Sequence, residues 1–288
     1  MLFSLLVTLR EGIEIALVVT ILLGYLRNIN QKRYFRQVWI GVVLAALLSL
    51  AFGAALEVTS RELSGRVLEA FEGFTMLFAV AVLTWMVFWM KRQSAGISYA
   101  LRSQIDSALS RGSVMALALL AFSAVAREGI ETTLFLFAGS TNAGSATQFV
   151  GGGVLGFAIA AAAGVVLYYG AARLPLRQFF LVSGVVVVVL AAGMLANSLA
   201  ELHDAALIGD IGSRPWDTES TISMTSTMGK FLHTVLGYDS APATAQIAVY
   251  WAYMVAVLGA FLFMPASRPA EIRRVEAAAP AAGVVAES

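Results

Sequence analysis

The stretch LREGIE at residues 9–14 recurs as AREGIE at residues 126–131. The two copies share five identical residues in a row, three of them charged, and both lie in long apolar surroundings. Such a match within one chain indicates an internal duplication. Charged residues kept twice in apolar sequence also mark these positions as the first place to look for function.

The composition of the chain points to the membrane. Of 288 residues, 59% are hydrophobic and only 13% are charged, whereas soluble domains are nearer half apolar and a quarter charged. Stretches of about 20 apolar residues are long enough to cross a bilayer as helices. We therefore predict an all-α integral membrane protein. Its seven transmembrane helices are expected at residues 2–26, 37–57, 67–90, 112–138, 149–170, 178–200 and 246–264.

The charged residues between these stretches predict the orientation. Thirteen of the nineteen Lys and Arg residues fall in the alternate loops and the tail that would share one side. The positive-inside rule then puts the N-terminus outside and the C-terminus inside. Ten of the eighteen acidic residues fall on the outer side, where they would concentrate cations at an entrance. The alternative explanation is simple depletion of basic residues from translocated loops.

The two motif copies lie in the first and fourth predicted spans, which run in opposite directions. This is typical of inverted-topology repeats, which form binding sites near the bilayer midplane. We expect helices one to three and four to six to be the two repeats, with helix seven added. The predicted divisions are a transmembrane domain at 1–264, with repeat A at 1–90, repeat B at 112–200, an outer loop at 201–245 and helix seven at 246–264, and a disordered cytoplasmic tail at 265–288.

The spacing inside each motif suits a cation site. On a helix, residues three or four apart share a face, so each motif brings two carboxylates and one guanidinium together. The predicted metal ligands are Glu11, Glu14, Glu128 and Glu131, and the motif arginines are Arg10 and Arg127. We expect the arginines to neutralise the empty site and to move aside when metal arrives. Oxygen ligands suit hard cations, which leaves Fe(III), Fe(II), Mn(II), Mg(II) and Ca(II) open.

Other classes of function fit less well. A salt-bridge cluster that only holds helices together is the structural alternative, but small residues would do this at lower cost. An intramembrane enzyme would need a nucleophile with its base or a histidine-containing metal site, and the predicted spans contain no histidine. A channel or structural subunit would lack an ion site of its own. We therefore expect a transporter and not an enzyme.

Two intramembrane R-E-G-x-E motifs in the first and fourth of seven helices resemble the oxidase-dependent iron permease family, which includes fungal high-affinity permeases and the bacterial Efe-type permease. Residues 71–73 (FEG) and 82–90 (VLTWMVFWM) also resemble the bacterial branch. The resemblance covers residues 1–264. It implies that the chain carries iron across the inner (cytoplasmic) membrane into the cell, with the four motif glutamates binding iron in transit. The alternative is a permease for another divalent metal such as Mn(II) or Pb(II).

The resemblance also implies acidic metal-entry residues at the outer face. Glu69 and Glu72 match this pattern well, and Glu201, His203 and Asp204 match it more loosely. Periplasmic or extracellular iron-binding, oxidase or peroxidase proteins are the implied partners, besides the iron ion and the lipid bilayer. No organic cofactor and no nucleic acid are expected. The iron valence, the energy source, the oligomeric state and metal binding by His203 and Asp204 stay open.

Two further patterns concern packing. Residues 222–236 of the outer loop predict an amphipathic helix lying on the membrane. Small residues recur every four positions from 152 to 164, which allows close helix packing either within the bundle or between copies of the chain.

Overall fold

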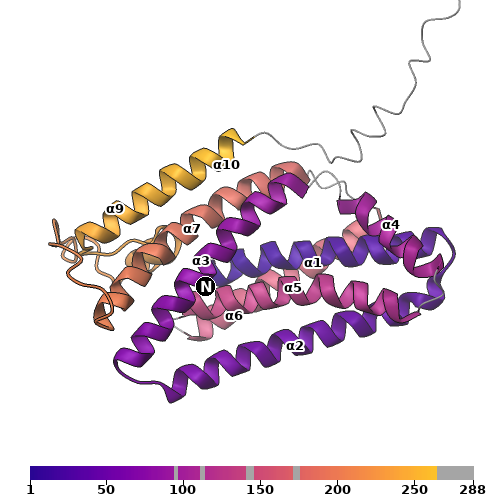
Figure 1. The fold of residues 1–288 in the computed structure, drawn as a ribbon. Coiled ribbons are helices and arrows are strands. Elements are labelled where there is room, and N and C mark those ends of the chain that lie inside the picture. Colours follow the sequence, from indigo (N-terminus) through magenta and orange to yellow (C-terminus); the bar gives the residue numbers. More distant parts are fainter. Residues whose placement is uncertain (94–96, 111–113, 141–145, 171–175, 265–288) are drawn as a thin grey trace, which may run out of the picture.

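The computed structural model describes residues 1–93, 97–110, 114–140, 146–170 and 176–264, and within these ranges it is helical with no strand. The predicted all-α class is therefore confirmed (Figure 1). The elements are α1 (Leu2–Asn28), the 3₁₀ turn η1 (Lys32–Tyr34), α2 (Phe35–Glu62), α3 (Arg66–Gln93), α4 (Ile97–Ser110), α5 (Val114–Ser140), α6 (Ala146–Tyr168), α7 (Leu176–Asp204), α8 (Thr227–Leu236), α9 (Thr244–Tyr253), the π-helical turn η2 (Met254–Leu258) and α10 (Gly259–Phe263).

Each of the seven predicted apolar stretches falls on a helix, the last of them on α9, η2 and α10 together. Among the described residues, five helical segments are long and apolar enough to cross a membrane: Lys32–Glu62, Arg66–Lys91, Ala146–Tyr168, Gln178–Asp204 and Thr244–Phe263. Helices α1 and α5 are equally long, but each carries the three charges of its motif in the middle. Composition alone therefore does not mark them as spans.

Two shorter helices lie between the long ones. Helix α4 lies in a segment that was predicted to be a loop between two spans. Its residues Ile105 and Ala108 pack against Leu22 and Leu26 of α1. Helix α8 was predicted as an amphipathic helix, and it begins after Ser226, whose side chain accepts a hydrogen bond from the Gly229 amide. The predicted tail 265–288 lies outside the described residues.

Helices α1 and α6 form one closely packed parallel pair. Gly156 faces Thr8, and Gly164 faces Ala16 two turns further along both helices. The two helices therefore run in the same direction. A Cβ atom added at Gly164 would lie 2.9 Å from that of Ala16, which leaves no room for a larger residue. The small residues predicted in α6 thus serve contact within the bundle.

Helices α2 and α5 form a second parallel pair in the same way. Gly41 faces the backbone of Ala118, and Gly53 faces Thr133, whose hydroxyl donates to the Ser49 carbonyl at 3.3 Å. The small residues of α2 (Gly41, Ala45, Ser49 and Gly53) also recur every four positions. In chain order, the first helix after each motif therefore packs on the motif helix of the other half.

The remaining pairings are antiparallel. The start of α1 meets the end of α5, where Phe3 fills the space beside Gly139. The start of α3 meets the end of α7, where Gly73 lies against Leu202. Helices α9 and α10 lie beside α7 (Figure 1), and Phe261 packs against Gly184.

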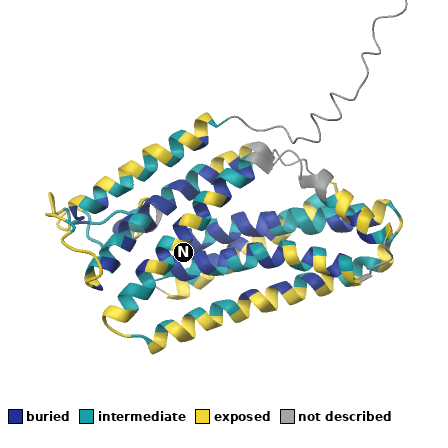
Figure 2. Cartoon of the chain, in the orientation of Figure 1, coloured by how far each residue is buried: buried dark blue, intermediate teal, exposed yellow. Residues whose placement is uncertain are grey.

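Burial divides the bundle into a polar-lined centre and an apolar surface. Figure 2 shows α1 buried or half-buried along most of its length, while α2 and the α9–α10 segment expose much of their length on opposite sides. Large apolar side chains cover this surface: Leu50 is 70% exposed, Phe78 61%, Val154 65% and Val255 70%. Apolar exposure on this scale suits contact with lipid rather than with water.

Candidate metal site between the two motif helices

Three carboxylates from the two motifs meet in the centre of the bundle. Glu11 of α1 and Glu128 and Glu131 of α5 each offer one oxygen, and these oxygens all lie within 4.8 Å of one another. All three side chains are buried, with between 1% and 7% of each residue exposed. Among the described residues, this is the one group of three or more His, Asp or Glu side chains with the spacing of a metal site.

The glycine inside each motif explains how the carboxylates reach this position. A Cβ atom at Gly12 would lie 2.7 Å from the Cβ of Ala160 on α6, so α1 can approach α6 only with glycine there. Gly129 has the equivalent contact with Ser49 on α2, at 3.0 Å from its Cβ. Each motif thus packs its glycine against a neighbouring helix, and Glu11 of the first motif meets Glu128 and Glu131 of the second.

The two motif arginines are not equivalent. Arg10 is 3% exposed, and its Nη1 and Nη2 atoms lie 2.6 Å from Glu11 Oε1 and 3.1 Å from Glu14 Oε1. Arg127 leaves 35% of its side chain exposed and lies 2.5 Å from Glu128 Oε1 but 3.7 Å from Glu131 Oε1. The first arginine is buried and pairs with both acids of its motif, whereas the second is partly exposed and donates two hydrogen bonds to Glu128.

Each carboxylate of the cluster keeps a buried oxygen with no hydrogen-bond partner: Oε2 of Glu11, of Glu128 and of Glu131. A buried polar atom without a partner costs about 1–3 kcal/mol, and more if it carries charge. With all six motif groups ionised, the four glutamates and two arginines carry a net charge of −2. Both features suit a site that receives a divalent cation.

Glu14 is the fourth predicted ligand, and its position differs from that of the other three. It belongs to the same buried region, with 5% exposed, but no oxygen of it joins the group within 4.8 Å. Its described contact is the ion pair with Arg10, on the turn of α1 that follows Glu11.

Helix α3 supplies two contacts that sequence reasoning missed. The sulfur of Met86 lies 3.2 Å from Arg10 Nη1, and the ring of Trp89 stacks under Arg127, with 4.2 Å from the guanidinium carbon to the ring centroid. The two residues are three positions apart and so share one face of α3. The sequence shows this spacing, but nothing in it links α3 to the arginines of other helices.

The predicted outer acids gather at one end of the bundle. Glu69 and Glu72 of α3 and Asp204 are electrostatic neighbours of Glu201 on α7, because Gly73 lets the two helix ends approach closely. His203 points elsewhere: its Nδ1 lies 3.1 Å from the Gly209 carbonyl. These residues form an acidic mouth, although their oxygens do not have the spacing of the central cluster.

Helix α8 and the turn after it cover this end of the bundle. Gly237, at a φ of 68°, touches Gly193 of α7, which lies eleven residues before the end of that helix. The loop thus reaches about 16 Å along α7. Helix α8 contacts α7 and α1, and the facing glycines let the turn after α8 come close to α7. Its place on the membrane surface stays a prediction.

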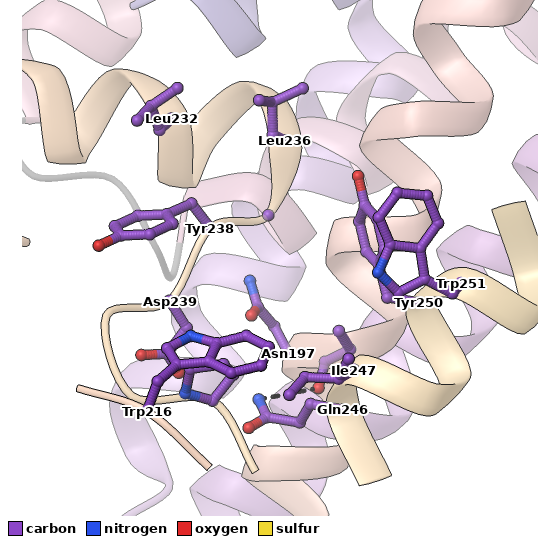
Figure 3. A pocket seen from close by; sticks show the side chains of 13 residues that line it. Asn197, Trp216, Leu232, Leu236, Tyr238, Asp239, Gln246, Ile247, Tyr250 and Trp251 are labelled. Carbon is purple, nitrogen blue, oxygen red and sulfur yellow. Dashed lines mark hydrogen bonds between the residues drawn. The ribbon is translucent and has the colours of Figure 1, made fainter. Parts of the chain in front are cut away.

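A pocket of about 300 Å³ lies between this loop, α7 and α9 (Figure 3). Trp216, Tyr238, Tyr250 and Trp251 line it together with Asn197, and Gln246 beside them donates to the Ala196 carbonyl at 3.2 Å. No lining residue belongs to either motif. The pocket is therefore separate from the carboxylate cluster.

Comparison with known proteins gives relatives over almost the entire chain. The model of the Iron permease FTR1 family matches residues 1–269. The chain is 37% identical over 267 residues to "Ferrous iron permease EfeU" of Escherichia coli O6:K15:H31 (strain 536), which covers 90% of this chain and 95% of the relative. It is 35% identical over 269 residues to the protein of the same name from Yersinia pestis, covering 91% and 93%. No solved structure matches the chain.

These relatives are permeases, which confirms the prediction of a membrane transporter and not an enzyme. The resemblance drawn from the two R-E-G-x-E motifs is confirmed as well. By the extent of the match and the identity to its relatives, the chain belongs to the iron permease FTR1 family.

Proposed function

We propose that this chain carries iron, as Fe(II), across the cytoplasmic membrane into the cell through the carboxylate cluster between α1 and α5. The observation that carries the proposal is the meeting of Glu11, Glu128 and Glu131, buried and within 4.8 Å of one another. The relatives bearing the name ferrous iron permease support Fe(II) as the form transported. Glu14 would receive or release the ion on the next turn of α1.

The electrostatics of the cluster support a passing divalent ion rather than a permanently held one. The net charge of −2 is matched by one divalent cation. The two arginines already neutralise part of the carboxylate charge, which limits the affinity and lets the ion leave. A site for transport needs this balance, because an ion bound too tightly would not be released.

We further propose that α1 and α5 also cross the membrane, which gives seven spans with the N-terminus outside and the C-terminus inside. The two halves, 1–90 and 112–200, would then be inverted repeats, followed by the outer loop 201–245, helix seven at 246–264 and the cytoplasmic tail 265–288. The two parallel pairs and the antiparallel contact of α1 with α5 support this arrangement. The motif charges are acceptable at membrane depth because they face one another instead of lipid.

The acidic mouth would serve as the entry. Glu69, Glu72, Glu201 and Asp204 would raise the local concentration of cations above the cluster. His203 would take no part in this, because its ring contacts the Gly209 carbonyl. Iron would be delivered there by a periplasmic or extracellular iron-binding, oxidase or peroxidase protein.

Another divalent metal such as Mn(II) is the second candidate, because an all-oxygen ligand set accepts Mn(II) as readily as Fe(II). Competition decides between them. If a modest excess of Mn(II) abolishes iron uptake and Mn(II) itself enters faster than iron, the chain is a manganese permease.

The test of the proposed function is iron uptake into proteoliposomes that contain the purified full chain. Fe(II) under reductant and Fe(III)-citrate are supplied separately to the wild type, Glu131→Gln and Glu14→Gln. Glu57→Gln is the matched control, because Glu57 pairs with Arg61 at the exposed end of α2, outside the cluster.

We expect uptake of Fe(II) by the wild type and the control, and loss of uptake in Glu131→Gln while its thermal unfolding stays close to that of the wild type. Uptake of Fe(III) alone would contradict the assigned valence. Wild-type rates in both motif variants would mean that the motif charges are structural.

A further inference from the structure

The thioether of Met86 lies inside the carboxylate site. Met86 is 1% exposed, and its sulfur is 3.2 Å from Arg10 Nη1. The same nitrogen is 2.6 Å from Glu11 Oε1. Because both atoms contact one nitrogen, the sulfur and the Glu11 oxygen are no more than 5.8 Å apart, the sum of these distances.

Packing alone does not account for a sulfur in this place. A thioether is a weak acceptor, so the Arg10 guanidinium gains little from it. Leucine would fill a similar volume without placing any heteroatom among charged groups. Met76, Met86 and Met90 all belong to the same apolar core cluster of buried residues. In the described part of the chain, Met86 alone of these three has its sulfur within hydrogen-bond distance of a charged group. Met86 is therefore the methionine of α3 whose sulfur meets the site.

The position of Arg10 shows what the sulfur would meet in a loaded site. A cation that displaced the guanidinium would take the place of Nη1, between the Glu11 carboxylate and the Met86 sulfur. The two groups would then flank the ion from α1 and α3, with Glu128 and Glu131 completing it from α5. Three carboxylates and one thioether make a four-ligand set of mixed hardness.

The softer thioether ligand would change which cations this four-ligand set prefers. A site made of carboxylates alone binds Mg²⁺ and Ca²⁺ as well as Fe(II). Mg²⁺ and Ca²⁺ are hard cations that prefer oxygen ligands. A thioether contributes little to a hard cation, whereas methionine sulfur is an established ligand of iron in haem proteins. The sulfur would thus add affinity for Fe(II) without adding affinity for its hard competitors.

We infer that Met86 is a metal ligand that makes the carboxylate site selective for Fe(II) over Mg²⁺ and Ca²⁺. The inference rests on the proposed function, since it assigns selectivity to the same site. It differs from that proposal in naming a residue outside both motifs.

The experiment compares Met86→Leu with Met90→Leu, which removes a buried sulfur from the next turn of α3. Uptake of Fe(II) into proteoliposomes is measured with increasing Mg²⁺ or Ca²⁺, and Glu131→Gln is included. We expect the wild type and Met90→Leu to discriminate equally, and Met86→Leu to lose about ten-fold in discrimination while still transporting Fe(II). Unchanged discrimination in Met86→Leu, with Glu131→Gln inactive, overturns the inference alone. Full uptake by Glu131→Gln instead overturns the proposed function.

X-ray absorption at the iron edge gives a second readout that does not depend on how the variant folds. The chain has no cysteine and ten methionines, so any sulfur bound to iron in it comes from methionine. We expect an iron–sulfur shell in the wild type loaded with Fe(II). A shell of oxygen alone in the wild type overturns the assignment of Met86 as a ligand.

Discussion

The guanidinium carbon of Arg127 lies 4.2 Å from the centre of the Trp89 ring, so α3 holds the arginine of the second motif by a cation–π contact. The same helix contacts the arginine of the first motif through Met86. Two motifs with the same sequence therefore have different surroundings. Arg127 is the more exposed of the two arginines, and it lies 3.7 Å from Glu131.

Replacing the Trp89 ring tests the cation–π contact with Arg127. In Trp89→Leu we expect Arg127 to approach Glu131 and compete with the metal for it. A contact of about 1 kcal/mol corresponds to an increase of about five-fold in the KM for Fe(II), with a smaller change in maximal rate. Trp85→Leu is the control, because Trp85 is 55% exposed and stacks on Trp89, whereas the ring that contacts Arg127 is that of Trp89. Equal KM values in the two variants would contradict this role of the ring.

The two arginines should differ in their effect on stability. Arg10→Gln leaves Glu11 and Glu14 in a fully buried place without their cation, and breaking a buried pair costs about 3–5 kcal/mol. Arg127→Gln should cost less, since that side chain is 35% exposed. Thermal unfolding in detergent measures the difference, and equal shifts would contradict it. If either variant folds and transports at the wild-type rate, that arginine does not take part in the transport cycle.

The contact between α1 and α6 should not tolerate a methyl group. In Gly156→Ala the new Cβ would collide with the Thr8 hydroxyl and the backbone of Leu5, so we expect a loss of about 1–3 kcal/mol. Gly151→Ala lies on the same helix with open space around its Cβ and should leave stability unchanged. The midpoints of thermal unfolding give the comparison. Similar midpoints for both variants would mean that the pair is less tightly packed than described.

The acidic mouth should act through long-range attraction. In Glu72→Gln and Glu201→Gln we expect uptake at low Fe(II) to fall a few-fold, with the maximal rate retained, because fewer cations collect at the entrance. The deficit should shrink as salt is raised, since salt screens the same attraction in the wild type. Asp106→Asn is the control, because Asp106 lies on α4, which packs at the other end of the bundle beside the end of α1. A deficit that is independent of salt would point to direct metal binding at the mouth.

The sequence by itself determined the long helices and the two of them that carry a charged motif. Apolar runs of about 20 residues set the long helices, because backbone groups in lipid must be satisfied within the segment. The spacing in LREGIE and AREGIE put two acids and an arginine on one face of each helix, because helical periodicity is a local property. The family followed from the same two motifs.

The tertiary structure decided which of these residues meet. Glu11, Glu128 and Glu131 come together while Glu14 stays with Arg10, and this depends on how α1 and α5 are rotated against each other. Small residues on α2 and α6 set that rotation through contacts with Gly129 and Gly12. The contacts of Met86 with Arg10 and of Trp89 with Arg127 depend on the placement of α3 in the same way. Local periodicity cannot contain this information, because it belongs to the packing of helices that are distant in the chain.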